Sequence, residues 1–380
     1  MLPHLGTGQP ALRVFMTADC VGGIWPYALD LARGLAALRV EVTLALLGPA
    51  PGARQLVEAA GVAGLRLLTT GLPLDWTAPD AASVHTASVQ LGVLARRAGA
   101  DIVHLNNPAF AASGNLDSPL LIVCHSCVAT WWAATKDGAL PADLAWRHDL
   151  TGIAYRRADR LAAPTEAFAA TTAAAYRLAA PPRVIHNGRA PVAATAPGPA
   201  GAFAFTAGRL WDAGKNLAAL DRAAARLRVP FLAAGPVQGP DGARISLSHL
   251  RLLGRLESGG VASHLASRPV FASAARYEPF GLAVLEAAQA GCALVLSDIP
   301  AFHEIWGDAA CYVAPDDDAG FADAIGRLLR DPSLRQRRGL AAQARGARYT
   351  VDAMVAGTTA LYREMLPRHP AFAAELEAGA

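Results

Sequence analysis

The chain has few charged residues, few cysteines and no long apolar run, although hydrophobic residues make up 53% of its 380 residues. Its apolar runs are short pieces such as Leu120–Cys124, whereas a helix that crosses a bilayer needs about 20 apolar residues. We therefore expect no membrane-spanning segment. Peripheral contact with a membrane through a basic amphipathic helix stays open.

The five cysteines are odd in number and spread along the chain, which argues against a disulfide framework. Residues Met1–Pro10 contain neither the basic region nor the apolar region of a secretion signal. We expect a protein of the reducing cytoplasm, with the inner face of the membrane as the other possible place.

Charged residues make up 17% of the chain, and the formal net charge is +3. The low charge and high hydrophobicity exclude a disordered protein, and so mild a net charge does not indicate a nucleic-acid-binding surface. The length exceeds what one hydrophobic core usually supports. We therefore expect a tightly packed α/β enzyme of two domains.

Short apolar runs alternate with longer helical patterns, as in βαβ units around a parallel sheet. The runs are almost continuously apolar because such strands are buried on both faces. Pro26–Leu38 and Thr86–Ala98 have the pattern of amphipathic helices. The first half predicts strands at Leu12–Thr17, Val40–Leu47, Leu65–Leu68, Asp101–Leu105, Leu120–Cys124, Arg160–Ala163 and Arg183–Ile185.

The segment Ala190–Gly201 has three prolines and no periodicity, which is typical of a linker. The alternation then begins again, with helices such as Leu217–Leu227 and Leu282–Ala290. Two parallel sheets joined by a linker can face each other with the carboxyl ends of their strands, where ligands bind. The second half predicts strands at Ala202–Ala207, Val229–Ala234, Arg251–Leu253, Pro269–Ala272, Ala293–Ser297 and Cys311–Val313.

The segment Tyr277–Glu286 follows a predicted strand and opens a predicted helix. The N–H groups of its first turn would be free to bind a phosphate, and they belong to three consecutive residues: Phe280, Gly281 and Leu282. Glu278 and Glu286 lie about 12 Å apart along an ideal helix axis, so they can bracket a diphosphate. The alternative is that both glutamates are solvated surface charges.

Arg209 and Lys215 lie six residues apart in a strand-to-helix loop that begins at Gly208. A guanidinium fork and a flexible ammonium suit the two phosphates of a diphosphate. The alternative is a pair of solvated loop charges, which the glutamate pair makes less attractive.

With these residues the chain resembles the retaining glycosyltransferases of family 4, which have the GT-B fold of two Rossmann-like domains. Their hallmark is a Glu-x7-Glu pair around Pro-Phe-Gly, which Glu278 and Glu286 match, and Leu296–Glu304 also follows the family pattern. The resemblance covers nearly the whole chain and is more specific in the second half. It implies that Glu278 contacts the donor sugar, that Glu286 contacts the ribose hydroxyls, and that Arg209 and Lys215 neutralise the leaving nucleoside diphosphate.

The resemblance also places glycine-rich loops beside the donor. Gly22 and Gly23 close the first strand-to-helix turn, where missing side chains allow a ligand to approach closely. Gly254 and Arg255 align with a loop that the family lays near the nucleotide base. The turn Asn187–Gly188 matches a family turn before the linker, so we expect it to serve hinge geometry.

His125 comes directly after a predicted strand and would emerge at its carboxyl end. The resemblance implies a contact with the donor sugar near the reaction centre; a structural histidine is the alternative. The flanking Cys124 and Cys127 lack the further ligands of a zinc site. Trp131 and Trp132 could carry an acceptor sugar or be packed in the core.

The resemblance implies an α/β GT-B fold whose last helix crosses back onto the first domain. Residues 1–190 would form the acceptor domain, completed by about 355–380; residues 191–201 would be the linker, and 202–354 the nucleotide-sugar donor domain. The implied reaction is metal-independent transfer of a hexose, with retention, from a nucleoside-diphosphate sugar to a hydroxyl of a glycan, lipid or small molecule. The alternatives are a non-catalytic nucleotide-sugar-binding protein and a nucleotide-sugar epimerase of the same fold. The base, the acceptor and the choice between monomer and homodimer are left open.

Overall fold

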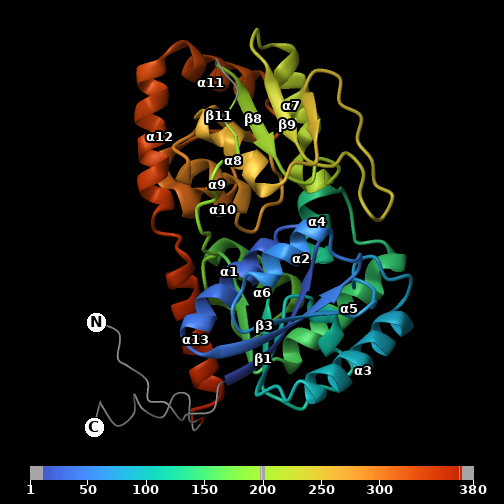
Figure 1. Cartoon of the computed structure of the whole chain (residues 1–380). Helices are drawn as coiled ribbons and strands as arrows, with labels where there is room; N and C mark the ends of the chain where they lie inside the picture. Colours follow the sequence, from blue (N-terminus) through green and yellow to red (C-terminus); the bar gives the residue numbers. More distant parts are fainter. Residues whose placement is uncertain (1–11, 197, 199–201, 368, 370–380) are drawn as a thin grey trace.

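The computed structural model describes residues 12–196, 198, 202–367 and 369, which form two α/β domains, one above the other in Figure 1. Met1–Pro10, part of the predicted linker and most of the segment after 367 lie outside the described residues. Each domain is built on one parallel sheet, seven-stranded in the first and six-stranded in the second.

The first sheet has the strand order β3-β2-β1-β4-β5-β6-β7, and all its neighbouring strands are parallel. Alternate residues of β1 enter different cores: Val14 and Met16 pack on one face of the sheet, and Phe15 packs on the other. Burial on both faces explains the continuous apolar runs in the sequence. The strands are β1 (Leu12–Asp19), β2 (Val40–Leu47), β3 (Leu65–Thr69), β4 (Ile102–Leu105), β5 (Leu120–Val123), β6 (Arg160–Ala163) and β7 (Arg183–Val184).

Two of the helices that cover this sheet begin at a residue whose side chain caps them. Asp80 accepts a hydrogen bond from Ser83 N at the start of α3, and Thr165 does the same for Phe168 N at the start of α6. The helices are α1 (Ile24–Ala37), α2 (Ala53–Ala60), α3 (Ala81–Arg97), the 3₁₀ turn η1 (Pro108–Ala111), α4 (Val128–Thr135), α5 (Ala142–Arg157) and α6 (Glu166–Tyr176).

The second sheet has the order β10-β9-β8-β11-β12-β13, again parallel throughout. Its strands are β8 (Ala204–Ala207), β9 (Phe231–Ala234), β10 (Arg251–Gly254), β11 (Val270–Ser273), β12 (Ala293–Ser297) and β13 (Ala310–Val313). Its helices and 3₁₀ turns are η2 (Ala213–Lys215), α7 (Leu217–Ala225), α8 (Ser258–Ala266), α9 (Leu282–Gln289), α10 (Pro300–Trp306), η3 (Gly307–Ala309), α11 (Asp318–Arg330) and α12 (Pro332–Gly346).

The last helix, α13 (Val351–Met365), returns to the first domain, and with α12 it runs along one side of both domains (Figure 1). Met354 and Leu361 belong to the core of the first domain. The Tyr362 hydroxyl lies 2.7 Å from Nδ1 of the buried His104 on β4. The crossing helix predicted from the family resemblance is therefore confirmed.

The predicted strands at Val40–Leu47, Arg160–Ala163 and Ala293–Ser297 have the bounds that the structure shows. The helix predicted at Thr86–Ala98 was placed too late, because the cap at Asp80 starts it at Ala81. The helix predicted at Pro26–Leu38 begins two residues earlier, at Ile24. The domain boundaries at 190 and 202 stay predictions, although the described residues of the predicted linker form no helix or strand.

Gly188 lies where the hinge meets the start of α13. A Cβ atom on Gly188 would lie 2.0 Å from the backbone oxygen of Thr350, which cannot move without shifting the helix. We expect Gly188→Ala to lower the free energy of unfolding by about 1–3 kcal/mol, as overpacking does, and thermal unfolding followed by circular dichroism measures this. Gly61→Ala is the matched control, because its added Cβ would meet only ordinary contacts at 3.6 Å. Equal unfolding midpoints for the two variants would contradict the tight packing of Gly188 against the Thr350 backbone.

Candidate functional site

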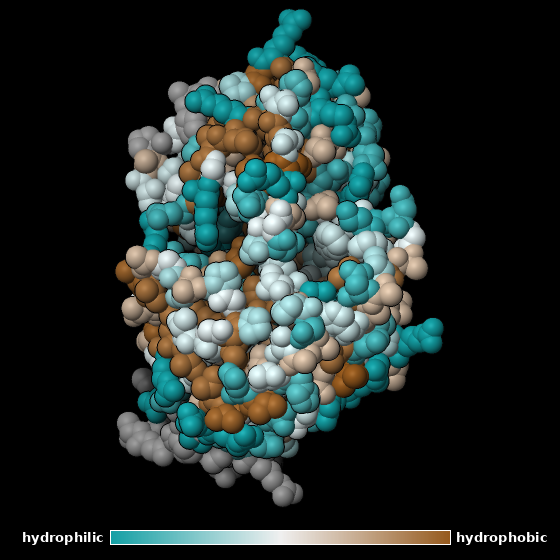
Figure 2. Space-filling model, turned by 90° about the vertical axis from the view of Figure 1, so that its right-hand side faces the viewer, coloured by the Kyte–Doolittle hydropathy of each residue, from teal (hydrophilic) through white to brown (hydrophobic). Residues whose placement is uncertain are grey.

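The carboxyl ends of both sheets meet between the domains. The loop after β1 reaches the second domain: a Cβ atom on Gly22 would lie 2.6 Å from Nη1 of Arg209, and one on Gly23 would lie 3.4 Å from the Leu282 side chain. Figure 2 shows that one face of the molecule is hollowed where the domains meet. The structure therefore brings together the predicted glycine turn, the predicted phosphate loop and the start of α9.

Two cations of this region are each held by a carboxylate. Lys215 Nζ forms an ion pair with Glu278 Oε2, and Arg209 Nη2 lies 2.7 Å from Asp212 Oδ2. Asp212 also accepts hydrogen bonds from Gly214 N and from Trp131 Nε1. Burial alone would raise the pKa of Asp212, but the charges of Arg209 and Lys215 hold it below its usual value. Asp212 thus fixes the loop that carries both cations.

Three glycines lie side by side at the ends of the strands β8, β9 and β10. Gly235 N donates to Gly254 O at 2.8 Å, and a Cβ on Gly235 would lie 1.8 Å from the backbone oxygen of Gly208. All three have positive φ angles, of 149° at Gly208, 145° at Gly235 and 68° at Gly254. They leave a floor without side chains, which suits close approach by a ligand. Gly235 was missed from the sequence, although its place after a predicted strand was a signal.

The helix α9 begins after Gly281, whose φ of 95° favours glycine. Phe280 is buried and packs edge-on against Tyr349 at 5.6 Å between ring centroids, so only its backbone could meet a ligand. Leu282 opens the helix, where the first N–H groups have no partner within the helix. The structure thus places a helix start at the interface, where an anion site is predicted.

Glu286 lies about one turn along α9, and its Oε1 is 2.7 Å from Nε of Arg189. Arg189 comes from the segment that follows the predicted hinge turn, and sequence reasoning did not single it out. Arg255 is exposed, and its positive charge partly offsets the rise that burial causes in the pKa of Cys20, a residue of the first domain. Both ends of the predicted donor pocket therefore lie at the domain interface.

His125 follows β5 on the first domain, and hydrogen bonds fix its orientation. Asn106 Nδ2 donates to Thr17 O at 2.7 Å, so Asn106 Oδ1 is the atom that accepts from His125 Nε2, at 2.8 Å. This arrangement places the proton on Nε2 and leaves Nδ1 as an acceptor. Burial lowers the pKa of His125 to about 3, so the ring is neutral at pH 7.

The cysteines beside His125 are buried thiols, and burial raises the pKa of Cys124 to about 12. In the part of the chain that the structure describes, no group of three His, Cys, Asp or Glu side chains could hold a metal ion. Trp131 donates to Asp212 and Trp132 donates to Gly138 O at 3.3 Å, so both indole N–H groups are used within the protein.

Several contacts between the domains were not predicted. The Tyr277 hydroxyl bonds to Cys127 N at 3.2 Å and to Thr130 Oγ1 at 2.9 Å. The Glu304 carboxylate accepts from the first two N–H groups of α6, those of Glu166 at 2.8 Å and Ala167 at 2.9 Å. These bonds fix the residue before Glu278 and the end of the Leu296–Glu304 segment against the first domain.

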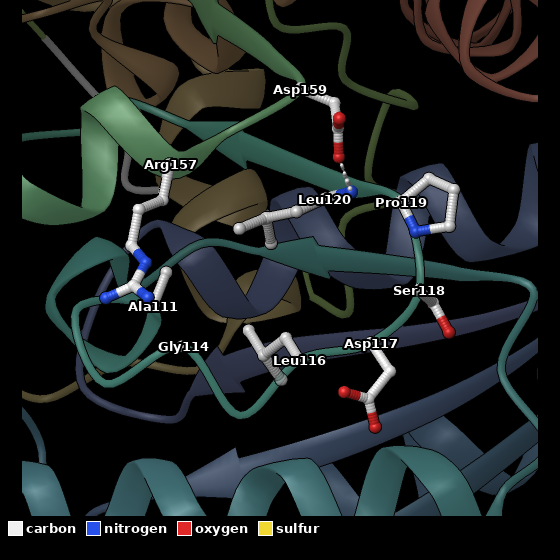
Figure 3. Close-up of a pocket in the computed structure, with 9 residues that line it drawn as sticks. All are labelled: Ala111, Gly114, Leu116, Asp117, Ser118, Pro119, Leu120, Arg157 and Asp159. Carbon is white, nitrogen blue, oxygen red and sulfur yellow. Dashed lines mark hydrogen bonds between the residues drawn. The ribbon is translucent and has the colours of Figure 1, made fainter.

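A pocket of about 370 Å³ lies elsewhere, at the amino ends of β5 and β6 (Figure 3). Figure 3 shows Arg157 on one side, Asp117 on the other and Leu116 with Leu120 between them. Leu120 N donates to Asp159 at 2.7 Å. Because ligands of parallel sheets bind at the carboxyl ends, this pocket is on the edge opposite to the candidate site.

Among the described helices, none combines the length and the apolar character that crossing a bilayer requires. The prediction of no spanning helix agrees with this, and the cytoplasmic location stays a prediction.

Curated relatives match the chain over part of its length. Glycogen synthase of Mycobacterium tuberculosis is 44% identical over 101 residues, which are 26% of this chain and 22% of that protein. Phosphatidyl-myo-inositol mannosyltransferase of Mycobacterium leprae is 36% identical over 94 residues, 24% of this chain and 25% of that protein. The matched segments thus span about a quarter of the length of these relatives.

Solved structures share the whole fold. Sucrose-phosphate synthase of Thermosynechococcus elongatus superposes with a TM-score of 0.73 at 16% identity, over 94% of this chain and 99% of that chain. HepE of Anabaena, solved in complex with UDP and glucose, gives 0.65 at 16% identity, over 93% and 100%. At such identity the likeness shows the fold, and it confirms the two facing Rossmann-like domains.

Two family models divide the chain between them at the predicted linker. The model described as Glycosyltransferase Family 4 matches residues 21–191, and the model described as Glycosyl transferases group 1 matches residues 201–331. Together with the fold, these matches show that the chain belongs to the family 4 and group 1 glycosyltransferases of the GT-B fold.

Proposed function

We propose that this chain transfers a hexose, with retention, from a nucleoside-diphosphate sugar to a hydroxyl acceptor between its two domains. The observation that carries the proposal is a cluster of charges at the start of α9. Lys215 pairs with Glu278, the charge of Glu278 also acts on Arg209, and the Glu278 side chain lies beside Gly281, after which α9 begins. Glu286 lies about one turn further along the same helix. This set can hold a sugar, a diphosphate and a ribose in that order.

Breaking the bond between the anomeric carbon and the phosphate oxygen makes the sugar positive and the leaving diphosphate more negative. Arg209, Lys215 and the helix N-terminus stabilise that negative charge, so the reaction needs no metal ion in this proposal. When the diphosphate takes Lys215 as a partner, Glu278 is released to contact the sugar. The carboxylate that now pairs with Lys215 thus becomes a sugar ligand.

The neutral ring of His125 fits a contact with a sugar hydroxyl, because Nδ1 is an acceptor. No protonated imidazole is available there at pH 7 to act as an acid. In this proposal the leaving phosphate itself accepts the acceptor's proton on the face where the bond breaks, which gives retention. Asn106 serves by holding the ring in this tautomer.

The donor is identified by a thermal-shift panel of UDP-, GDP- and ADP-glucose and -mannose. A ligand that binds the folded state raises the unfolding midpoint, so we expect one base to give a clear rise and its plain nucleoside, without phosphates, to give almost none. If no nucleotide sugar or nucleoside diphosphate shifts the midpoint at millimolar concentration, the proposed function is wrong.

The two cations provide the next test. We expect Arg209→Ala and Lys215→Ala each to lower kcat by about 10²–10³-fold, because the charge they meet grows in the transition state. Release of nucleoside diphosphate from the donor chosen by the panel, with water or a supplied hydroxyl acceptor, measures the rate. Arg222→Ala is the matched control, since Arg222 pairs with Asp318 at the surface of α7. Unchanged turnover in both cleft variants contradicts the phosphate assignment.

Asp19 and Asp75 are two carboxylates of the first domain: the charge of Arg209 acts on Asp19, and the charge of Asp19 acts on Asp75. Burial raises the pKa of Asp75 to about 6, and the charge of Asp19 adds to the shift. In the unfolded chain Asp75 titrates near 3.8. An acid whose pKa rises on folding destabilises the folded state as the pH rises from about 4 to 6, and the cost is fully present above that window.

Asp75→Asn therefore removes a cost that exists only above this window, while Asn keeps an acceptor for Trp76 N. We expect the unfolding midpoint to rise by about 1–3 °C at pH 7.5 and to stay unchanged near pH 4. Asp80→Asn is the control: hydrogen bonds from Ser83 lower the pKa of Asp80, so its loss should not stabilise at pH 7.5. The same shift of the Asp75 variant at both pH values contradicts this account.

A further inference from the structure

Arg189 bridges the two domains through two carboxylates. Its Nη1 lies 2.7 Å from Asp30 Oδ2 on α1, and its Nε lies 2.7 Å from Glu286 Oε1 on α9. The side chains of Arg189 and Asp30 are 8% and 1% exposed, whereas that of Glu286 is 22% exposed. The bridge is therefore buried at its first-domain end and open at Glu286.

The backbone of Arg189 is fixed as well as its side chain. Arg189 N donates to Tyr349 O at 3.3 Å, and Gln289 Nε2 donates to Arg189 O at 2.8 Å. The next N–H, that of Ala190, also points to Asp30, at 3.4 Å. The guanidinium thus has a fixed origin, and its planar fork can meet two carboxylates in only a few geometries.

This arrangement limits what Glu286 can do. Arg189 uses Oε1, and Oε2 accepts no hydrogen bond from any residue that the structure describes. A carboxylate near a bound diphosphate would repel it, and the guanidinium beside Glu286 offsets that repulsion. Removing the guanidinium would leave Asp30 buried with the exposed Arg33 as its one ionic partner among the described residues.

We propose that Arg189 is a positioning residue for the nucleotide: it holds Glu286 through one oxygen so that the other can accept hydrogen bonds from the ribose hydroxyls. The inference rests on the proposed function, which assigns Glu286 to the ribose. It adds that the hinge segment itself orients the ribose ligand and links it to α1 of the opposite domain.

The test measures how strongly the protein prefers ribose with hydroxyls. Calorimetry compares the nucleoside diphosphate chosen by the panel, UDP, GDP or ADP, with its 2′,3′-dideoxy form in the full chain. We expect the wild type to bind the hydroxylated form about tenfold or more tightly, since hydrogen bonds to a charged group are strong. Arg189→Met should reduce that ratio to below about threefold. Arg33→Met is the matched control, because Arg33 pairs with the same Asp30 but is exposed and lies on α1; it should keep the wild-type ratio.

The remaining variants separate the possible failures. Glu286→Gln should reduce the ratio as Arg189→Met does, and the double variant should reduce it no further. If Glu286→Gln keeps the ratio, the ribose assignment and that part of the proposed function fail. If Glu286→Gln reduces it but Arg189→Met only lowers the unfolding midpoint, Arg189 is structural and this inference is overturned. Should Arg189→Met fail to fold, Arg189→Lys serves in its place, because one ammonium cannot bridge both carboxylates with the same geometry.

Discussion

The proposed donor pocket depends on the relative position of two parallel sheets whose carboxyl ends face each other. Neither sheet carries the whole set of side chains: His125 comes from the first, whereas Arg209, Lys215 and Glu286 come from the second. Polar contacts across the interface hold the two domains in this position. The Tyr277 hydroxyl bonds to the first domain, and the Glu304 carboxylate caps α6. The crossing helix α13 adds an apolar attachment, because it packs in the core of the first domain.

A second feature unites the site: three cations of the proposed donor pocket each have a carboxylate partner. Lys215 is paired with Glu278, Arg209 with Asp212, and Arg189 with Glu286. Such pairs keep the charged side chains oriented at the partly buried interface. The side chains therefore need to rearrange less when a diphosphate binds. The pairs of Arg209 and Lys215 differ in how they are held. Asp212 accepts further hydrogen bonds, so Arg209 keeps its anchor, whereas in the proposed function Glu278 exchanges Lys215 for the donor sugar.

The sequence predicted strands correctly where burial on both faces requires a continuous apolar run. Strands such as Val40–Leu47 are buried on both faces, so the apolar run and the strand have the same ends. The start of α3 was missed because a cap at Asp80 decides it, and the apolar pattern begins later. Within the candidate site, the spacing along the chain was enough to predict the glutamate pair and the two cations, Arg209 and Lys215, that are proposed to bind phosphate. Arg189 was not, because its partners come from α1 and α9, 159 and 97 residues away.

A crystal structure of the protein with the nucleoside diphosphate that it binds would show whether the ligand occupies the proposed donor pocket. We expect the diphosphate at the N-terminus of α9, in contact with Arg209 and Lys215, with the ribose hydroxyls on Glu286 and Arg189 still bound to that carboxylate. A diphosphate found away from these residues, for example in the pocket beside Arg157, would contradict the account.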